Sequence, residues 1–217
     1  YLNTLYDDEL KKTNKKTYQQ MVFDAAELEW NKQPCEIFLS KKDKEYAETF
    51  VSKNNLNTKK LIGIHMGASS RWPSKVWHKF RLIEFIKLAK SKGFEILLFA
   101  GPNEVEAYQK IVEKLKKESI TIYQNNPHNS DREFISLVNI CNSMICSDSF
   151  ALHISLALNK PTVGLFFCTS PNEVESYSLL KKIVSPMLKD VFPEKCDLYD
   201  EELVKSISAE QVLDSVN

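Results

Sequence analysis

A short loop of small and hydroxyl-bearing residues carries the clearest chemical signal in the sequence. It reads GASSRWPSK (67–75) and follows the apolar run LIGI (61–64) after His65 and Met66. Gly67 allows another group to approach the backbone, and Ser69 and Ser70 can donate hydrogen bonds to phosphate oxygens. Lys75 is expected at the start of the next helix, whose positive dipole end also favours anions. The loop therefore indicates a diphosphate site. The alternative is a turn capped by Ser74, with Lys75 in solvent.

A second group of polar residues lies in the stretch CSDSFALH. Asp148 ends an apolar run, Ser149 follows, and His153 comes about one helical turn later, with its side chain leaning back toward the helix start. These three side chains could hold sugar hydroxyls and a phosphate. The alternative is a helix cap beside a buried, hydrogen-bonded histidine. A Ser-His-Asp triad is disfavoured because no G-x-S-x-G motif surrounds Ser149.

Two further features are weaker. Glu104, after AGPN, could reach a ribose diol, although the pattern alone favours a solvated first-turn glutamate. The stretch 166–177 is long enough to fold over a ligand or to be a plain surface connection. The ATP fingerprint G-x-x-x-x-G-K-[ST] and the dinucleotide fingerprint G-x-G-x-x-G are both absent, which disfavours a dehydrogenase or an epimerase.

Regular alternation of apolar strands with helices would position these residues. The predicted strands cover 61–66, 94–100, 119–123, 143–147 and 161–167, and the predicted helices cover 75–93, 103–117, 130–141 and 150–158. Strands that are apolar throughout indicate an α/β fold, a Rossmann-like parallel sheet with helices on both faces. Ligands bind beyond the carboxyl ends of such strands. The candidate residues concentrate in the loops at that edge, 67–75, 101–104, 124–130, 148–150 and 168–173.

The first 60 residues differ from the rest because they contain no glycine. We expect a mainly helical N-terminal segment here, with helices over 15–30 and 42–55 and a short strand over 36–40. The chain starts at Tyr1 rather than at Met, which is typical of a fragment or a processed chain.

Composition excludes several classes of protein. The 29 basic and 29 acidic residues balance, which argues against a nucleic-acid binder. No apolar run approaches the length of about 20 residues that spans a bilayer. The five cysteines contain no CxxC pair and show no zinc-ligand spacing with the four histidines, so we expect reduced thiols in a cytosolic protein without a metal site.

Three motifs in this order resemble glycosyltransferase family 9, the ADP-heptose:lipopolysaccharide heptosyltransferases. They are IGIHMGASSRWPSKVW, LLFAGPNEVE and SDSFALHISLALNKPTVGLFFCTSPNE, and the tail ISAEQVLDSV resembles the closing helix of the family. The resemblance implies a GT-B architecture of two Rossmann-like domains, with the nucleotide sugar bound by the C-terminal one. Residues 1–60 then correspond to the remnant of the N-terminal domain and a linker, and residues 61–217 to the donor domain.

The resemblance also implies roles for individual residues. Ser69, Ser70, Lys75, Ser149 and His153 would hold the donor diphosphate, Asp148 the heptose hydroxyls, Glu104 the ribose, and the backbone around Asn129 and Ser130 the adenine. The implied reaction is an inverting transfer of heptose from ADP-heptose to a lipopolysaccharide core acceptor, without a cofactor or tightly bound metal. The parent family works in the cytoplasm at the inner membrane face. An orphaned N-terminal segment would expose apolar surface and favour a homodimer.

This sequence departs from the family in three ways. Phe150 stands where the family has a glycine, and Cys168 and Thr169 stand in a stretch where the family has F-G-P-T, which leaves the donor open. The part of the N-terminal domain that supplies the acidic catalytic base is missing, so the catalytic residue is unknown and this chain alone is expected to be inactive. The competing hypothesis is a non-catalytic nucleotide-binding or interaction module derived from the same fold.

Overall fold

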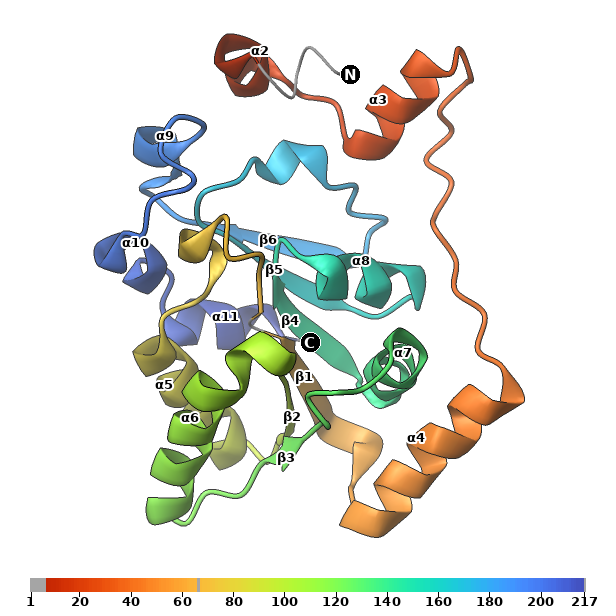
Figure 1. Ribbon diagram of the computed structural model, residues 1–217, viewed down its shortest axis with the longest axis vertical. Coiled ribbons are helices and arrows are strands. Elements are labelled where there is room, and N and C mark those ends of the chain that lie inside the picture. The colour runs from red at the N-terminus through yellow and green to blue at the C-terminus, as the bar shows by residue number, and fades with distance from the viewer. Residues whose placement is uncertain (1–6, 66, 217) are drawn as a thin grey trace.

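A six-stranded parallel sheet forms the centre of the molecule in the computed structural model, which describes residues 7–65 and 67–216 (Figure 1). The strand order is β3-β2-β1-β4-β5-β6, and every neighbouring pair is parallel. The strands are β1 (Leu61–His65), β2 (Glu95–Phe99), β3 (Tyr123–Gln124), β4 (Ser143–Ser147), β5 (Thr162–Phe166) and β6 (Leu180–Val184). The predicted Rossmann-like α/β fold is confirmed. The predicted strand end at Met66 lies outside the described residues.

Helices cover both faces of this sheet (Figure 1). On one face, α5 (Lys79–Ser91), α6 (Val105–Lys117) and α11 (Ala209–Ser215) pack on Ile62 and Ile64 of β1. On the other face, α7 (Asp131–Ile140) and α8 (Phe150–Ala157) pack on Leu61. Because successive strand residues point to opposite faces, a strand that is apolar throughout can contribute to two separate cores.

The sixth strand, β6, was not predicted from the sequence. In its sequence, LKKIV, Leu180 is buried, Lys181 is exposed and Lys182 is intermediate. It pairs only with β5 and lies at the edge of the sheet. Lysines in an edge strand are a common way to prevent edge-to-edge pairing, and they interrupt the continuous apolar run by which the other strands were found.

The helix predicted to start at residue 75 starts later. Residues 73–75 form a short 3-10 helix, and α5 begins at Lys79 with His78 as its N-cap. The alternative considered for this loop, a turn capped by Ser74, is therefore wrong in the role it gave Ser74. Its hydroxyl is buried, donates to the Leu198 carbonyl over 2.8 Å and accepts from the Asp200 amide over 2.9 Å. The dipole of α5 consequently provides no argument for anion binding at Lys75.

Within residues 7–60, the N-terminal segment forms the helices α2 (Asp8–Thr13), α3 (Tyr18–Ala25) and α4 (Lys41–Asn54). The helix predicted over 15–30 is shorter, because Thr17 caps its start and Glu27 adopts a left-handed φ of 57° just beyond its end. The strand predicted over 36–40 is wrong. Residues 28–40 form a long connection without helix or strand (Figure 1), although the Ile37 amide donates to the Ala157 carbonyl over 3.3 Å.

An ion pair between Asp43 and Arg132 fastens α4 to the start of α7. Arg132 also donates to the Phe38 carbonyl over 2.8 Å. Hydrogen bonds from Arg132 and then from Ser40 lower the pKa of Asp43 to about 2. Since an unfolded aspartate titrates near about 3.9, this carboxylate stabilises the fold at neutral pH and loses that contribution as the pH falls from about 4 to 2.

Asp43→Asn is accordingly expected to lower the urea midpoint of unfolding at pH 7, with a smaller difference from the wild type at pH 3. Urea titrations at the two pH values would measure this. Glu48→Gln, which removes an exposed carboxylate from the same helix, is the matched control and should have little effect at either pH. An Asp43→Asn defect of equal size at both pH values would contradict the assigned ion pair.

Candidate functional site

The strand order reverses between β1 and β4. After β1 the chain builds the sheet outward through β2 and β3, then returns to add β4 on the other side of β1. In parallel α/β sheets the crevice beyond the carboxyl ends of two such strands is the usual ligand site. The loops that follow β1 and β4 carry the two strongest sequence motifs.

Lys75 and Asp148 meet at this point. The Lys75 ammonium lies 2.8 Å from Oδ2 of Asp148 and 3.1 Å from its carbonyl oxygen. Both side chains are largely shielded, with exposed fractions of 12% and 15%. The same ammonium lies 4.7 Å from the centre of the Trp72 ring. Charges in such a shielded position interact more strongly with a ligand than charges in bulk water.

Ser149 lies at the N-terminus of α8 with an unused hydroxyl. Its Oγ is buried and has no hydrogen-bond partner among the described residues, and its side chain does not cap the helix. A buried hydroxyl without a partner costs stability, so such groups often mark the place of a ligand. The alternative to a ligand site was a helix cap formed by these residues. The Ser149 side chain does not form such a cap.

His153 lies one turn further along α8 and is exposed, whereas most of this helix is buried. Desolvation lowers the pKa of His153. The charge of Asp148 opposes this shift, and that of Lys75 adds to it. The imidazole is therefore neutral at pH 7 and can accept one hydrogen bond and donate another.

Ser69 and Ser70 are exposed in the loop that follows β1. The Ser69 hydroxyl accepts from the Arg71 amide over 3.4 Å, and its carbonyl accepts from the Trp72 amide over 2.9 Å. These contacts form a turn. Within the part of the chain that the structure describes, neither serine hydroxyl forms a hydrogen bond with Lys75 or Asp148.

Glu104 lies at the end of a short 3-10 turn after β2. Its carboxylate accepts a hydrogen bond from the Gly101 amide over 2.9 Å. A Cβ atom on Gly67 would lie 3.0 Å from the His65 ring and 3.2 Å from the Glu104 carboxyl carbon. A side chain at position 67 would therefore have to displace the His65 ring or the Glu104 carboxylate slightly.

Asn129 and Ser130 have side chains that are already engaged. The Asn129 amide donates to the Tyr46 hydroxyl over 2.6 Å, and its oxygen accepts from Asn125 over 3.3 Å. Ser130 caps α7 in a capping box with Glu133. Only the backbone of this stretch is left for a ligand, which is the part that the resemblance assigned to adenine.

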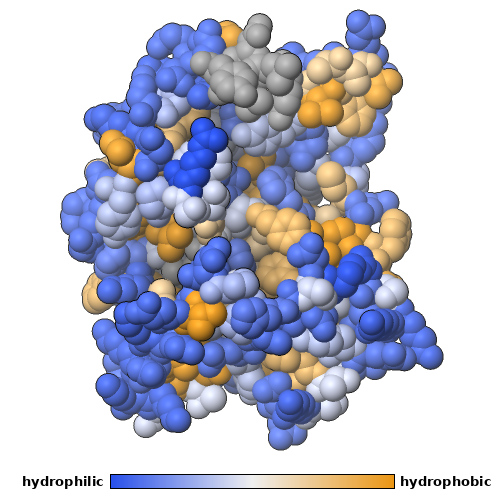
Figure 2. All heavy atoms as spheres, in the orientation of Figure 1, coloured by the Kyte–Doolittle hydropathy of each residue, from blue (hydrophilic) through white to orange (hydrophobic). Residues whose placement is uncertain are grey.

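Phe150, the residue in the place of the family glycine, presents an aromatic ring at the surface. It is 54% exposed, and its ring centre lies 6.0 Å from that of Phe134. Figure 2 shows hydrophobic side chains gathered over the region of α8 on a mostly hydrophilic face. Phe134 in turn contacts His65 and Phe99. Burial lowers the pKa of His65 to about 4, so this ring is uncharged.

Several residues of the site were missed by the sequence analysis. Trp72 is one of them, because the Lys75 ammonium lies over its ring. Thr169, after β5, has a buried hydroxyl without a hydrogen-bond partner in the described chain. Glu173 is only 9% exposed and faces a cavity beside the Lys75–Asp148 pair. A small hydroxyl residue or a glutamate in a loop gives no periodic signal that could have identified it.

Residues 7–65 and 67–216 contain neither a cluster of metal-ligating side chains nor a membrane-spanning helix. No group of three or more histidine, cysteine, aspartate or glutamate side chains is arranged to hold a metal ion. No helix in this part of the chain has both the length and the apolar character needed to cross a membrane.

Comparisons with known proteins point to one family. Residues 3–196 match the sequence model of glycosyltransferase family 9 (heptosyltransferase). The lipooligosaccharide heptosyltransferase 2 of Haemophilus influenzae is 23% identical over 224 residues, which covers 95% of this chain and 64% of that protein. The chain spans between 32% and 64% of the length of the first curated relatives that it matches.

Solved structures share the fold. A family 9 glycosyl transferase from Veillonella parvula superposes with a TM-score of 0.76 at 20% identity, over 94% of this chain and 60% of the other. An Escherichia coli heptosyltransferase solved with ADP-2-deoxy-2-fluoro heptose superposes with a TM-score of 0.54 at 18% identity, over 77% of this chain and 46% of the other.

Proposed function

Because this chain belongs to glycosyltransferase family 9, the heptosyltransferase family, we propose that it is the donor-binding part of an inverting glycosyltransferase. The donor is ADP-heptose and the acceptor is a lipopolysaccharide core sugar. In this proposal residues 1–60 are the end of an N-terminal domain with its linker, and residues 61–217 bind the nucleotide sugar. The observation that carries the proposal is the shielded Lys75–Asp148 pair at the switch point of a parallel sheet.

The chemistry of each residue suits this role. The Lys75 ammonium binds the diphosphate and stabilises the negative charge that develops on it as the bond to the sugar breaks. Asp148 fixes the ammonium and accepts hydrogen bonds from the heptose hydroxyls. The free hydroxyl of Ser149 and the neutral ring of His153 add donors at the same place. Ser69 and Ser70 bind the phosphates when the loop closes on them.

The rest of the nucleotide lies toward β2 and β3 in this proposal. Glu104 binds the ribose, and the backbone at Asn129 and Ser130 borders the adenine. The base that removes the proton from the acceptor hydroxyl belongs to the part of the longer relatives that this chain does not span. We therefore expect no turnover by this chain alone. The choice of donor is supported by the Escherichia coli heptosyltransferase of the same fold, which was solved with a fluorinated ADP-heptose.

Calorimetric titration with ADP, UDP and GDP tests this function directly. Selective binding of ADP supports an ADP-sugar donor. Selective binding of UDP or GDP keeps the glycosyltransferase but replaces the donor. Failure to bind any of the three would overturn the assignment of a working donor site in this chain.

Phe150 is the one observation that favours the alternative, a non-catalytic module. In the present proposal its half-exposed ring instead stacks on the nucleotide beside Phe134. Aromatic stacking on a base contributes about 1–3 kcal/mol. Phe150→Ala is thus expected to weaken ADP binding by about 5-fold or more with little change in the melting temperature. Calorimetry and thermal unfolding measure the two quantities. Tighter binding by Phe150→Ala would show that the ring obstructs the phosphates and would favour the non-catalytic module.

The proposal also covers the cellular location of the enzyme and its oligomeric state. The acceptor of the whole enzyme is lipid-linked, so the enzyme works in the cytoplasm as a peripheral protein of the inner membrane. Two copies of this chain pair through apolar surface on the N-terminal segment, where Val22 and Phe38 are 49% and 79% exposed. Sedimentation of the isolated chain would reveal such a homodimer.

A further inference from the structure

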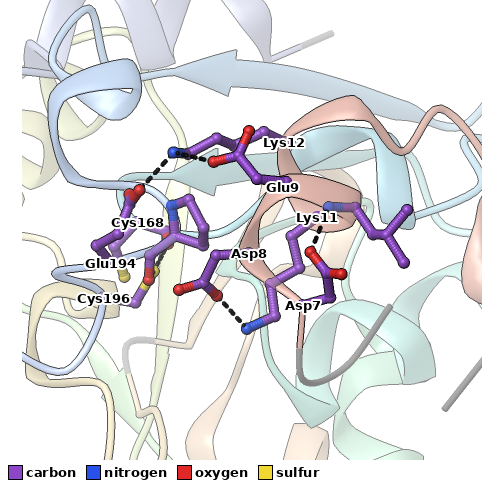
Figure 3. A network of polar contacts seen from close by, with 10 residues as sticks. Asp7, Asp8, Glu9, Lys11, Lys12, Cys168, Glu194 and Cys196 are labelled. Carbon is purple, nitrogen blue, oxygen red and sulfur yellow. Dashed lines mark hydrogen bonds and ion pairs between the residues drawn. The ribbon is translucent and has the colours of Figure 1, made fainter. Parts of the chain in front are cut away.

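The N-terminal segment is attached to the donor domain at two separate places. Near α2, Lys12 pairs with Glu9 over 3.0 Å and with Glu194 of the donor domain (Figure 3). These charges are exposed, so this attachment contributes little to stability. At the other place, α4 packs on α7 beside the loop 124–130 (Figure 1). The second attachment therefore adjoins the loop that borders the adenine in the proposed function.

Tyr46 joins α4 to this loop. The side-chain amide of Asn129 donates to the Tyr46 hydroxyl oxygen over 2.6 Å. The side-chain oxygen of Asn129 accepts from the amide of Asn125 over 3.3 Å. The Asn129 side chain thus lies between a residue of the N-terminal segment and a residue of the donor domain. Tyr46 and Asn129 are both half-buried, which strengthens hydrogen bonds relative to those in open solvent.

Asn125 is the buried centre of this network, with an exposed fraction of 7%. Its side-chain oxygen accepts from the Ala100 amide over 2.8 Å, and its side-chain nitrogen donates to the Ala100 carbonyl over 3.0 Å. The same nitrogen donates to the Asn126 carbonyl over 2.9 Å. Ala100 and Asn125 directly follow β2 and β3. One side chain therefore replaces the backbone pairing of the two strands where they end, and it fixes the distance between the loops that follow.

The contacts of Asn125 show why Asn129 needs a second partner. A side-chain amide has two N–H groups, whereas the nitrogen of Asn125 has three acceptors within bonding distance. The contact with Asn129, at 3.3 Å, is the longest of the three and the weakest. The nitrogen of Asn129 also lies 3.4 Å from the Glu133 carboxylate. The bond to Tyr46, at 2.6 Å, is therefore the shortest contact that holds the Asn129 side chain.

This network ends at the residues that carry the nucleoside in the proposed function. Ala100 is followed by Gly101, whose amide donates to the Glu104 carboxylate over 2.9 Å. At the other end, the backbone amide of Asn129 donates to the Asn126 carbonyl over 3.0 Å and closes the turn before α7. A shift of the Asn129 side chain would therefore move the backbone assigned to adenine relative to Glu104.

We propose that Tyr46 is a positioning residue for the nucleoside part of the donor site. It holds the side chain of Asn129 and, through Asn125, sets the spacing between the loops that bind the ribose and border the adenine. Tyr46 acts through Asn129 and leaves the diphosphate site at Lys75 unaffected. The N-terminal segment thus contributes to the affinity for the nucleoside. This inference rests on the proposed function, which places the nucleotide against these loops.

Calorimetric and NMR titrations of the full chain with ADP and with inorganic diphosphate test this role. Tyr46→Phe removes only the hydroxyl and is expected to weaken ADP binding by about 2- to 10-fold, the effect of one neutral hydrogen bond. The affinity for inorganic diphosphate should stay that of the wild type. A general distortion of the donor domain would weaken both ligands, so the difference between them identifies positioning. An equal loss for both ligands, or no loss for ADP, would overturn the role.

A double-mutant cycle tests whether Tyr46 acts through Asn129. Asn129→Ala is expected to weaken ADP binding at least as much as Tyr46→Phe does, and the double variant no more than Asn129→Ala alone. Losses that add in the double variant would show that Tyr46 acts independently of Asn129, which would contradict the proposal.

Two control variants and the wild type complete the experiment. Tyr199→Phe removes a hydroxyl from a tyrosine that is 57% exposed, and Lys12→Gln breaks the attachment at α2. Both should bind ADP like the wild type. Weaker binding by Lys12→Gln would mean that docking of the whole segment sets the affinity, and it would overturn the specific role of Tyr46. A wild-type chain that binds no nucleotide would refute the donor assignment and this role with it. Unchanged ADP affinity in Tyr46→Phe, beside a wild type that binds ADP, would refute only the role of Tyr46.

Discussion

Replacing Lys75 with alanine is expected to weaken ADP binding by about 10- to 100-fold, because a charged hydrogen bond to phosphate is worth about 1.5–3 kcal/mol. The effect should lie in this range since the ammonium is only 12% exposed and is fixed by Asp148 over 2.8 Å. A solvated surface lysine would contribute far less. The entropy of ordering this side chain has already been spent in the unliganded fold.

Calorimetry on Lys75→Ala and Lys75→Arg would measure this effect. Arginine keeps the charge but not the compact shape of the ammonium, so it should recover only part of the affinity. Lys79→Ala is the matched control because Lys79 is exposed and lies outside the site. Thermal unfolding must accompany each titration, since Lys75→Ala leaves Asp148 without its cation. Unchanged ADP affinity in a folded Lys75→Ala protein would mean that the loop is an ordinary turn.

The proximity of Lys75 and Asp148 could be predicted without any contact information. Both residues follow strands that are apolar throughout, and parallel strands bring their carboxyl ends to one edge of a sheet. Local patterns also identified β4 with its bounds, Ser143–Ser147, and α7 to within one residue at each end. Local sequence was sufficient to predict the position of a single strand or helix, such as β4 and α7.

Other features depend on residues far away in the chain. One alternative from the sequence had Ser74 capping the turn, but its hydroxyl bonds residues 198 and 200, more than 120 positions later. The start of α5 at Lys79 follows from that contact and from Pro73. The cavity beside the pair depends on where α2 and α3 dock, which no motif in residues 8–25 encodes. Tertiary contacts of this kind override local helix signals.

A second large effect is expected at Trp77, where Trp77→Ala should lower the free energy of unfolding by about 3–5 kcal/mol. The ring is 1% exposed and lies 6.0 Å from Phe85 of α5. Its indole nitrogen donates to the Ile207 carbonyl over 3.0 Å. This single side chain thus joins the end of the loop after β1 to the C-terminal tail. A loss of this size is a large fraction of the roughly 5–15 kcal/mol by which a typical domain is stable.

Urea unfolding of three variants would separate the contribution of the Trp77 ring to stability from that of its hydrogen bond to the Ile207 carbonyl. Trp77→Phe keeps most of the ring but leaves the Ile207 carbonyl unpaired, so it should cost about 1–3 kcal/mol. Trp30→Ala, which removes a partly buried ring packed on Phe23, is the control and should cost less than Trp77→Ala. An equal decrease in the free energy of unfolding for Trp77→Ala and Trp30→Ala would contradict the large contribution of Trp77 to stability.

The contacts of Trp77 also affect the position of Lys75 at the proposed donor site. Trp77 and Ser74 fix the loop after β1 by donating hydrogen bonds to carbonyls of the C-terminal part of the chain. Lys75, in the same loop, binds Asp148. Trp77→Phe should therefore weaken ADP binding a few-fold even where the protein is fully folded, because the anchored loop no longer presents Lys75 at a fixed place. Unchanged ADP affinity in folded Trp77→Phe would show that the Lys75–Asp148 pair alone fixes the loop.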